Sequence, residues 1–205
     1  LLSGDIGNRM FDKYKEIAPK RFINCGIAEG NMMSMAAGMA LSGLRPVVYT
    51  ITPFITTRCL EQIRTGVAYH NAPVIIVGTG SGLSYSELGA THHSLEDIAI
   101  MRSIPNLQVC APVDSIELVA QLKQAINERK PTYIRIGKKG EQNLVGKTSK
   151  LGIGKANMIS NGREKIILGI GPILKNAIDA KEILKKEGVE IGIASKIEIK
   201  ADKRA

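Results

Sequence analysis

The chain has 205 residues, of which 44% are hydrophobic, and its mean hydropathy is +0.01, values typical of a soluble globular protein with one large domain, or one domain and part of another. No apolar run approaches the roughly 20 residues that span a bilayer, and the N-terminal LLSGDIGNRM lacks the basic start and apolar stretch of a signal peptide, so we expect a cytoplasmic protein without membrane partners. The net charge of +9 comes from scattered lysines rather than from a basic block with interleaved aromatics, which argues against nucleic acid and is compatible with anionic small substrates.

The three cysteines, Cys25, Cys59 and Cys110, are widely spaced, and each lies in or beside an apolar segment. An odd number at such spacing suits reduced core thiols better than disulfides. The spacing typical of zinc ligands is missing from the sequence, and three histidines make a metal cluster improbable, so we expect no metal site on this chain.

Short β-rich runs alternate with segments of helical periodicity along most of the chain. The runs are RFINCG, PVVYTI, PVIIVGTG, LQVCAP and PTYIRIG. Strands that alternate with helices form a parallel sheet with helices on both faces. The sequence therefore predicts an α/β fold with a doubly wound parallel sheet.

Four segments have the pattern of helices, namely residues 29–42, 56–70, 114–127 and 172–187. The first is apolar nearly all round and ends before Gly43, which predicts a buried helix. The second is amphipathic, because Leu60, Ile63 and Val67 lie at i, i+3 and i+7. The fourth begins at Pro172 and ends before Gly188.

The helix at 114–127 opens with Asp114 and Glu117 in the spacing of a capping box. Its periodicity predicts one apolar face made of Ile116, Val119, Leu122 and Ile126.

The stretch from 138 to 162 is rich in Gly, Lys and Asn, which favours a domain boundary. We expect one domain at residues 1–145 and a second at 152–205. The second holds a new strand, helix and strand in about 45 residues, too few for a typical independent domain. It should therefore dock on the first domain or be cut short.

Two features point to one edge of the predicted sheet. The polar loop from Gly80 to Ser94 is long enough to suggest function, and it follows the carboxyl end of the strand PVIIVGTG. Glu29 follows the end of FINCG. Ligands of open parallel sheets bind at the carboxyl edge, so both features predict a site there.

Glu29 lies among small residues in INCGIAEGNMMSMAAG. One interpretation is a first-turn acid that the helix dipole favours and that faces solvent. The other is a partly buried carboxylate that shares a proton with a ligand nitrogen. The small neighbours favour the second, because they let a ligand approach the backbone.

His92 and His93 are adjacent in the polar loop, and histidine is apt for acid and base chemistry at neutral pH. At most one of two adjacent side chains in extended chain faces a given ligand. The alternative is a histidine that enters a helix and bonds nearby backbone.

Phe54 follows the strand PVVYTI, where it could be a core aromatic or a stacking platform for a flat ring. Four arginines, Arg58, Arg64, Arg102 and Arg135, could bind phosphate or carboxylate, or form ordinary surface salt bridges.

In combination, these segments resemble the pyrimidine-binding half of transketolase-like thiamine diphosphate enzymes, specifically the C-terminal section or subunit. The resemblance rests on GIAEGNM, on PFITTRCLEQIR, on SELGATHHSLEDIAIMRSIPNLQV and on APVDSIEL, in the family's order. It covers residues 1 to about 137, and residues 152–205 look like the opening of the family's C-terminal domain.

The resemblance implies that Glu29 hydrogen-bonds the pyrimidine of thiamine diphosphate and favours the imino form that generates the ylid. Phe54 would stack on the pyrimidine, and Ile51, which stands where relatives often have a first Phe, would also contact the cofactor. His92 would contact the sugar during ketol transfer, with His93 and Arg58 as further substrate ligands. The carbanion chemistry is the cofactor's own.

The family's diphosphate-binding domain, whose G-D-G and Asn motif holds Mg²⁺, has no counterpart in this sequence. The resemblance therefore implies an N-terminal diphosphate-binding partner subunit that carries the Mg²⁺ ligands, within a homodimer or heterotetramer. The expected substrate is a sugar or sugar phosphate.

The sequence departs from the family at two substrate positions. Leu88 replaces an Asp that touches sugar hydroxyls, and Ala111 replaces an Arg that many transketolases use on phosphate. Two alternatives thus stay open. One is a deoxyxylulose phosphate synthase, whose Thr-His-His the loop shares, and the other is a non-catalytic binding or scaffold module of the same fold.

Overall fold

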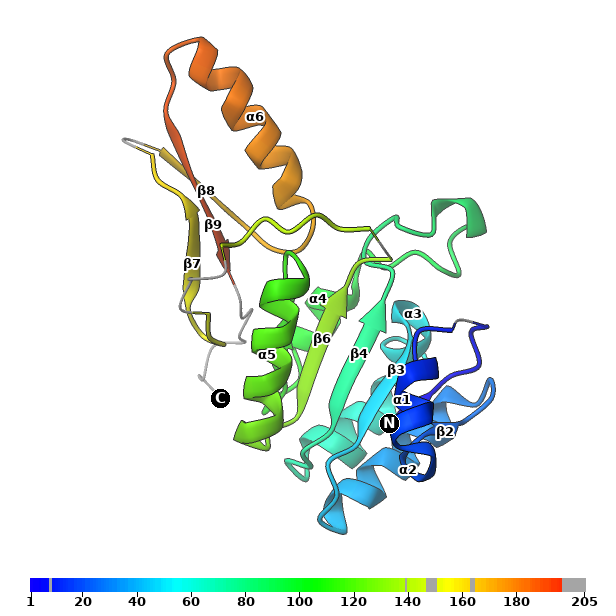
Figure 1. The fold of residues 1–205 in the computed structure, drawn as a ribbon. Coiled ribbons are helices and arrows are strands. Elements are labelled where there is room, and N and C mark those ends of the chain that lie inside the picture. Colours follow the sequence, from blue (N-terminus) through cyan, green and yellow to red (C-terminus); the bar gives the residue numbers. More distant parts are fainter. Residues whose placement is uncertain (8, 139, 147–150, 163–164, 197–205) are drawn as a thin grey trace.

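Six parallel strands form the main sheet in the order β2-β1-β3-β4-β6-β5 (Figure 1). The computed structural model describes residues 1–7, 9–138, 140–146, 151–162 and 165–196. The six strands are β1 (Leu2–Ser3), β2 (Ile23–Asn24), β3 (Val47–Ile51), β4 (Ile75–Thr79), β5 (Gln108–Cys110) and β6 (Thr132–Ile136). This sheet confirms the predicted α/β fold.

The helices that connect these strands are α1 (Asp12–Ile17), η1 (Pro19–Arg21), α2 (Glu29–Leu41), α3 (Thr52–Ile55), η2 (Gln62–Ala68), η3 (Ser86–Leu88), α4 (Asp97–Arg102) and α5 (Ser115–Glu128). Within the described residues, none of the helices is both long and apolar enough to cross a membrane.

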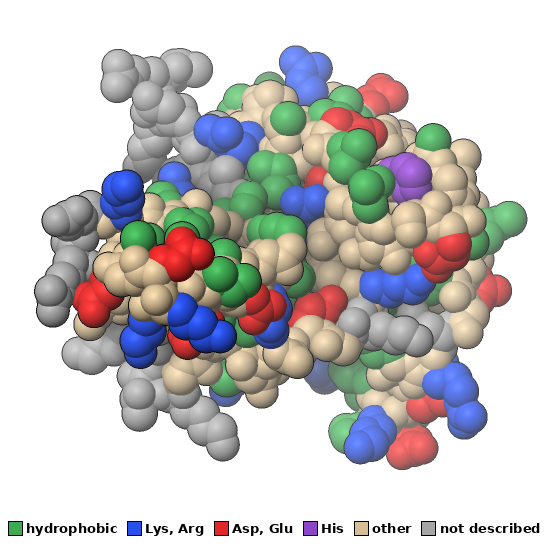
Figure 2. Space-filling model, turned by 90° about the horizontal axis from the view of Figure 1, so that it is seen from above, with side chains coloured by type: hydrophobic (Ala, Val, Ile, Leu, Met, Phe, Trp, Pro, Cys, Tyr) green, Lys and Arg blue, Asp and Glu red, His purple; other side chains and the backbone are tan. Residues whose placement is uncertain are grey.

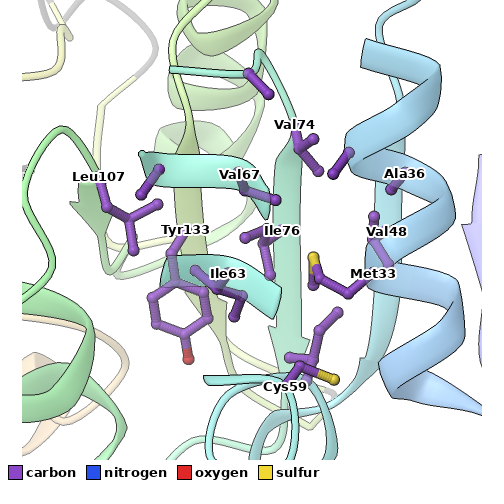
Figure 3. Close-up of a cluster of buried hydrophobic side chains, with 14 of the residues drawn as sticks. Met33, Ala36, Val48, Cys59, Ile63, Val67, Val74, Ile76, Leu107 and Tyr133 are labelled. Carbon is purple, nitrogen blue, oxygen red and sulfur yellow. The ribbon is translucent and has the colours of Figure 1, made fainter. Parts of the chain in front are cut away.

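Alternate residues of the strands pack on opposite faces of the sheet, as a period of two requires. Val48 and Ile76 belong to the core under α2 and η2, whereas their neighbours Tyr49 and Ile75 belong to the core under α5. Figure 3 shows the first of these cores, which includes Met33, Ala36, Cys59, Ile63, Val67, Val74 and Tyr133. Helices therefore cover both faces, and the sheet is doubly wound.

The segment predicted as an amphipathic helix at 56–70 is partly different. A turn occupies residues 56–59, and η2 is a π-helix rather than an α-helix. Ile63 and Val67 are fully buried and Leu60 is half-buried, so the predicted apolar stripe is confirmed. Ile63 and Val67 belong to the same core as residues of α2, β3 and β4, so the stripe stays buried although the turns are of π type.

The predicted apolar face of α5 is wrong for Val119 and Ile126, which are 51% and 43% exposed. The buried stripe contains Glu117, Gln121 and Ala125 instead. The reason is that α5 packs against the sheet on one side and against a second group of strands on another, so polar residues take inward positions that periodicity assigns to apolar ones.

Asp114 is the N-cap of α5, as the sequence predicts, and its Oδ1 accepts from the amides of Ile116 and Glu117 at 3.0 and 2.9 Å. Its Oδ2 accepts from the amides of Leu144 and Val145 at 2.7 and 2.8 Å. One carboxylate thus caps the helix and fixes the chain that leaves β6.

A smaller sheet of three strands follows, in the order β7-β9-β8, with β9 antiparallel to β7 and parallel to β8. Its elements are β7 (Ala156–Ser160), β8 (Lys165–Gly169), α6 (Leu174–Lys186) and β9 (Ile191–Lys196). The helix α6 agrees with the predicted helix at 172–187. The division at 145 and 152 stays a prediction, and residues 197–205 of the predicted second domain lie outside the described residues.

The small sheet is joined to α5 by a buried carboxylate. Glu117 is fully buried and accepts from the Val113 amide at 3.0 Å, from Asn157 Nδ2 at 3.2 Å and from the Ser195 hydroxyl. Because a buried carboxylate is costly unless it is hydrogen-bonded, these donors couple the two sheets.

We expect Asp114→Ala to lower the free energy of unfolding by about 1–3 kcal/mol, because four amides lose their acceptor. Urea denaturation measures this change. Ser115→Ala is the matched control, since it removes only an exposed hydrogen bond to Asn143 and should change stability by less than about 0.5 kcal/mol. Equal effects of the two substitutions would contradict the capping role.

Candidate active site

The candidate site lies at the carboxyl ends of the strands, where the connections change direction. The chain passes from β1 to β2 on one side and then from β2 to β3 on the other side of β1. In an open parallel sheet, a crevice forms where the connections of neighbouring strands run to opposite sides, which here is beside β1. Gly4 follows β1, Phe54 follows β3, and Glu29 follows β2, so all three lie at this edge of the sheet.

Glu29 is buried at the start of α2, with only 3% of its side chain exposed. Its Oε2 lies 2.9 Å from Arg58 Nη1. A Cβ added at Gly4 would lie 3.8 Å from Glu29 Oε1 and only 2.7 Å from Thr50 Oγ1, so the glycine lets β1 approach β3 beneath the carboxylate. The structure thus excludes the interpretation of Glu29 as a solvent-facing acid.

Arg58 and Phe54 form the next contact in the row. The Arg58 guanidinium lies 4.3 Å from the centroid of the Phe54 ring, in a cation–π contact, and half of its side chain is exposed. Phe54 itself is half-buried. The alternative of Phe54 as an ordinary core residue is therefore not what the structure shows.

His92 continues the row on the other side of Phe54. The two ring centroids are 5.0 Å apart in an edge-to-face arrangement, and the Tyr85 ring lies 6.2 Å from His92. His92 Nδ1 is 3.0 Å from the Thr91 hydroxyl, whereas His93 Nε2 is 3.4 Å from the Ser86 carbonyl. The adjacent histidines thus contact different groups, as expected.

The remaining predicted residues are placed less centrally. Ile51 is the last residue of β3 and is 9% exposed. Arg64 is exposed in an open groove of about 440 Å³ that begins beside Arg58, and Arg102 is exposed at the end of α4. Arg135 forms a buried ion pair with Asp97. The structure therefore unites Glu29, Arg58, Phe54 and His92 rather than the whole predicted set.

Sequence reasoning missed Tyr85 and Lys138. The Lys138 ammonium lies 4.5 Å from the centroid of the Tyr85 ring and 2.5 Å from Glu87 Oε1. Lys138 extends the row of contacts beyond His92. Its position just after the strand PTYIRIG, at the same carboxyl edge, could have identified it.

Two buried groups near the site are held in the neutral form. Burial, with Glu29 as a smaller cause, raises the pKa of the Cys59 thiol to about 12, and its Sγ lies 3.2 Å from the Phe54 carbonyl. Burial and then the neighbouring Asp97 raise the pKa of the Tyr133 phenol well above its ordinary value. Cys59 and Cys110 are buried free thiols and Cys25 is half-buried and free, in keeping with core thiols.

Charges of both signs are interspersed with apolar side chains over this end of the molecule, which Figure 2 shows from above. Among the described residues, no group of three or more His, Cys, Asp or Glu side chains is arranged to hold a metal ion. The expectation that this chain lacks metal ligands stays a prediction.

Residues 3–141 match the family model described as "Transketolase, pyrimidine binding domain". A subunit of the apulose-4-phosphate transketolase of Phocaeicola vulgatus is 32% identical over 92% of this chain and 61% of its own. A putative transketolase C-terminal section of Methanocaldococcus jannaschii is 35% identical over 97% of this chain and 63% of its own. The chain thus spans less than two thirds of these relatives.

A 1-deoxy-D-xylulose-5-phosphate synthase of Thermus thermophilus is 36% identical over 82% of this chain and 27% of its own. Among solved structures, one described as "Split gene transketolase, inactive beta4 tetramer" aligns with a TM-score of 0.82 at 29% identity, over 95% of this chain and 64% of that one. The similarity therefore includes the arrangement of the strands.

We expect Cys59→Ala to flatten the loss of stability at alkaline pH. The pKa of Cys59 is raised from 9.0 to about 12 in the folded state. The thiol's contribution to the free energy of unfolding is therefore complete below pH 9 and is lost as the pH rises toward 12. In that window the group lowers the free energy of unfolding by about 1.4 kcal/mol per pH unit. Urea denaturation between pH 8 and about 10 measures the slope.

Cys25→Ala is the control for this experiment. The pKa of Cys25 is also raised, but its thiol is half-buried, so removing it should change the slope less than removing Cys59. Identical slopes for the wild type and Cys59→Ala would contradict the raised pKa.

Proposed function

The chain belongs to the family of transketolase pyrimidine-binding domains, and on this premise we propose that it is the C-terminal subunit or section of a transketolase-like enzyme. Such an enzyme transfers two-carbon ketol units between sugars with thiamine diphosphate, which supplies the carbanion chemistry when bound. The observation that carries the proposal is the buried Glu29 in contact, through Arg58, with an aromatic ring at the sheet's crevice.

Glu29 and Phe54 have the chemistry that a pyrimidine ring requires. The Glu29 carboxylate is 3% exposed, so little water competes with a ring nitrogen for its hydrogen bond. The half-buried Phe54 offers a face for stacking. Ile51, at the end of β3, is the apolar residue that we assign beside them. These residues would bind and orient the cofactor ring.

Arg58 must leave Glu29 and Phe54 when a ring stacks on that face. Its side chain is 50% exposed, so the guanidinium can return to water, and the buried Glu29 that it leaves then needs the ring as its new hydrogen-bond partner. The released guanidinium would then be available to a substrate anion, which supports its assignment as a substrate ligand.

His92 lies at the edge of Phe54 and is the residue that we assign to the reacting sugar. The distance of 5.0 Å between the two ring centroids supports this assignment, because a group stacked on Phe54 would have the imidazole nearby. His93 contacts the Ser86 carbonyl, so the geometry supports His92 before His93.

The row of contacts includes two cations that an anionic substrate would draw from their present partners, since Arg58 is paired with Glu29 and Lys138 with Glu87. Arg58 lies beside Phe54, and Lys138 lies beyond Tyr85. Ala111, by contrast, is 1% exposed, and its carbonyl accepts from the Gly171 amide at 3.0 Å, so an arginine there would have no room. We therefore assign recognition of a sugar phosphate to Arg58 and Lys138.

The diphosphate and Mg²⁺ are assigned to a partner subunit. The described residues provide no cluster for a metal, and two relatives are named as one subunit of a transketolase and as a C-terminal section. Assembly of this chain with an N-terminal subunit, in a homodimer or a heterotetramer, would complete the site. The β4 tetramer in the description of the similar structure supports self-association.

We expect Glu29→Gln to lower turnover at least about a hundredfold in the complex with the diphosphate-binding partner, because the amide cannot exchange a proton with the ring. Glu16→Gln, at an exposed position of α1, is the matched control and should leave turnover unchanged. Unchanged turnover and cofactor affinity in Glu29→Gln would favour a non-catalytic module.

We further expect the same complex to convert pentose phosphates by ketol transfer rather than to condense pyruvate with glyceraldehyde phosphate. The two transketolase relatives match 92% and 97% of this chain and the synthase 82%, which favours ketol transfer. The Thr-His-His of the loop favours the synthase. Product analysis with each substrate pair separates the two. Activity with pyruvate and glyceraldehyde phosphate but not with pentose phosphates would assign the chain to the synthase instead.

A further inference from the structure

The loop from Gly80 to Ser94, which carries His92, is closed at its base. The Gly82 amide donates to the Ser94 carbonyl at 3.1 Å, and the Ser94 amide donates to the Gly82 carbonyl at 2.9 Å. Arg135 Nη2 donates to the same Ser94 carbonyl at 2.9 Å. Ser94 is 1% exposed, so its carbonyl is fixed inside the protein two residues from His92.

Arg135 is itself held by buried groups. Its Nε lies 3.2 Å from Asp97 Oδ2, and the two side chains are only 17% and 2% exposed. The Tyr133 hydroxyl donates to the same carboxylate oxygen at 2.7 Å. Since Asp97 begins α4 and Arg135 lies on β6, the ion pair joins the helix after the loop to the strand beneath it.

The contacts of the His92 ring are weaker than those of Arg135 with Asp97 and Ser94. Edge-to-face contacts with Phe54 and Tyr85 are individually weak, and the Thr91 hydrogen bond is exposed. A buried ion pair, by contrast, constrains its partners strongly, because breaking it leaves an uncompensated charge. The position of the ring therefore follows the backbone that Ser94 fixes.

We propose that Arg135 is a positioning residue that sets the place of His92 relative to Phe54 by holding the Ser94 carbonyl while it is paired with Asp97. Its catalytic consequence rests on the proposed function, but the geometry is measurable without activity. A guanidinium is required, because it reaches Asp97 through Nε and Ser94 through Nη2 at once, whereas an ammonium is a single point charge.

The test compares Arg135→Lys with Tyr133→Phe in the whole protein. Both substitutions weaken the same buried group around Asp97, but only the first removes the contact with Ser94. NMR reports the His92 ring protons, whose shifts depend on the Phe54 and Tyr85 rings, and hydrogen exchange reports the amides of Gly82 and Ser94.

We expect Arg135→Lys to accelerate exchange at both amides about tenfold relative to core amides and to move the His92 ring shifts. Tyr133→Phe should leave the shifts unchanged and the exchange within about twofold. Unchanged values in Arg135→Lys, or the same changes in both variants, would overturn the proposal. Should Arg135→Lys fail to fold, Asp97→Asn, which keeps an acceptor but removes the charge, should show the same changes more weakly.

Activity of the complex with the partner is the second measurement. We expect kcat/KM to fall about tenfold or more in Arg135→Lys and less than about threefold in Tyr133→Phe. A wild-type complex without ketol transfer would refute the proposed function and leave the exchange and shift data to decide the positioning claim. Loss of activity without a change in either would overturn the positioning claim alone.

Discussion

The parallel direction of the strands is the constraint on which the rest of this structure depends. It brings the ends of β1, β3, β4 and β6 to one edge, and the reversal around β1 opens a crevice there. Residues as distant in sequence as Gly4, Glu29, Phe54 and His92 become neighbours only because of it. The alternating burial of Val48 and Tyr49 fixes the register of β3, so a slip by one residue would dismantle both cores and the crevice.

Two buried acids of the chain are paired with arginines, but in different ways. Glu29 pairs with Arg58, whose side chain is 50% exposed, whereas Asp97 pairs with Arg135, whose side chain is 17% exposed. An exposed cation regains water when it leaves its partner, and a buried one does not. The two pairs therefore differ in how readily the cation can leave, because Arg58 can return to water more easily than Arg135.

Local patterns allowed β2 to β6, β8, β9, the start of α2 and the Asp114 cap to be predicted from the sequence, because each depends on neighbouring residues, whereas β7 lies in the stretch predicted as a domain boundary. The roles of Val119 and Ile126 were mispredicted because the polar partners of α5, such as Asn157, come from another sheet. The π-type turns of η2 and the contacts of Lys138 were also missed, because the spacing of apolar residues fixes neither the type of helical turn nor a tertiary contact. Glu29 and His92 were proposed as site residues separately, yet only the fold shows that Arg58 and Phe54 connect them.

The row of contacts from Glu29 to Lys138 also differs from one end to the other in how far the core supports it. Its inner end, Glu29 and Phe54, is buried or half-buried and supported by the sheet, so it tolerates little change. Its outer end, Tyr85 and Lys138, involves the loop from Gly80 to Ser94, which Lys138 contacts through Tyr85 and Glu87 and whose residue Leu88 is 49% exposed. Such a loop changes at little cost to the core. The inner part of the row is thus linked to the stability of the fold, whereas its outer part can vary with the loop.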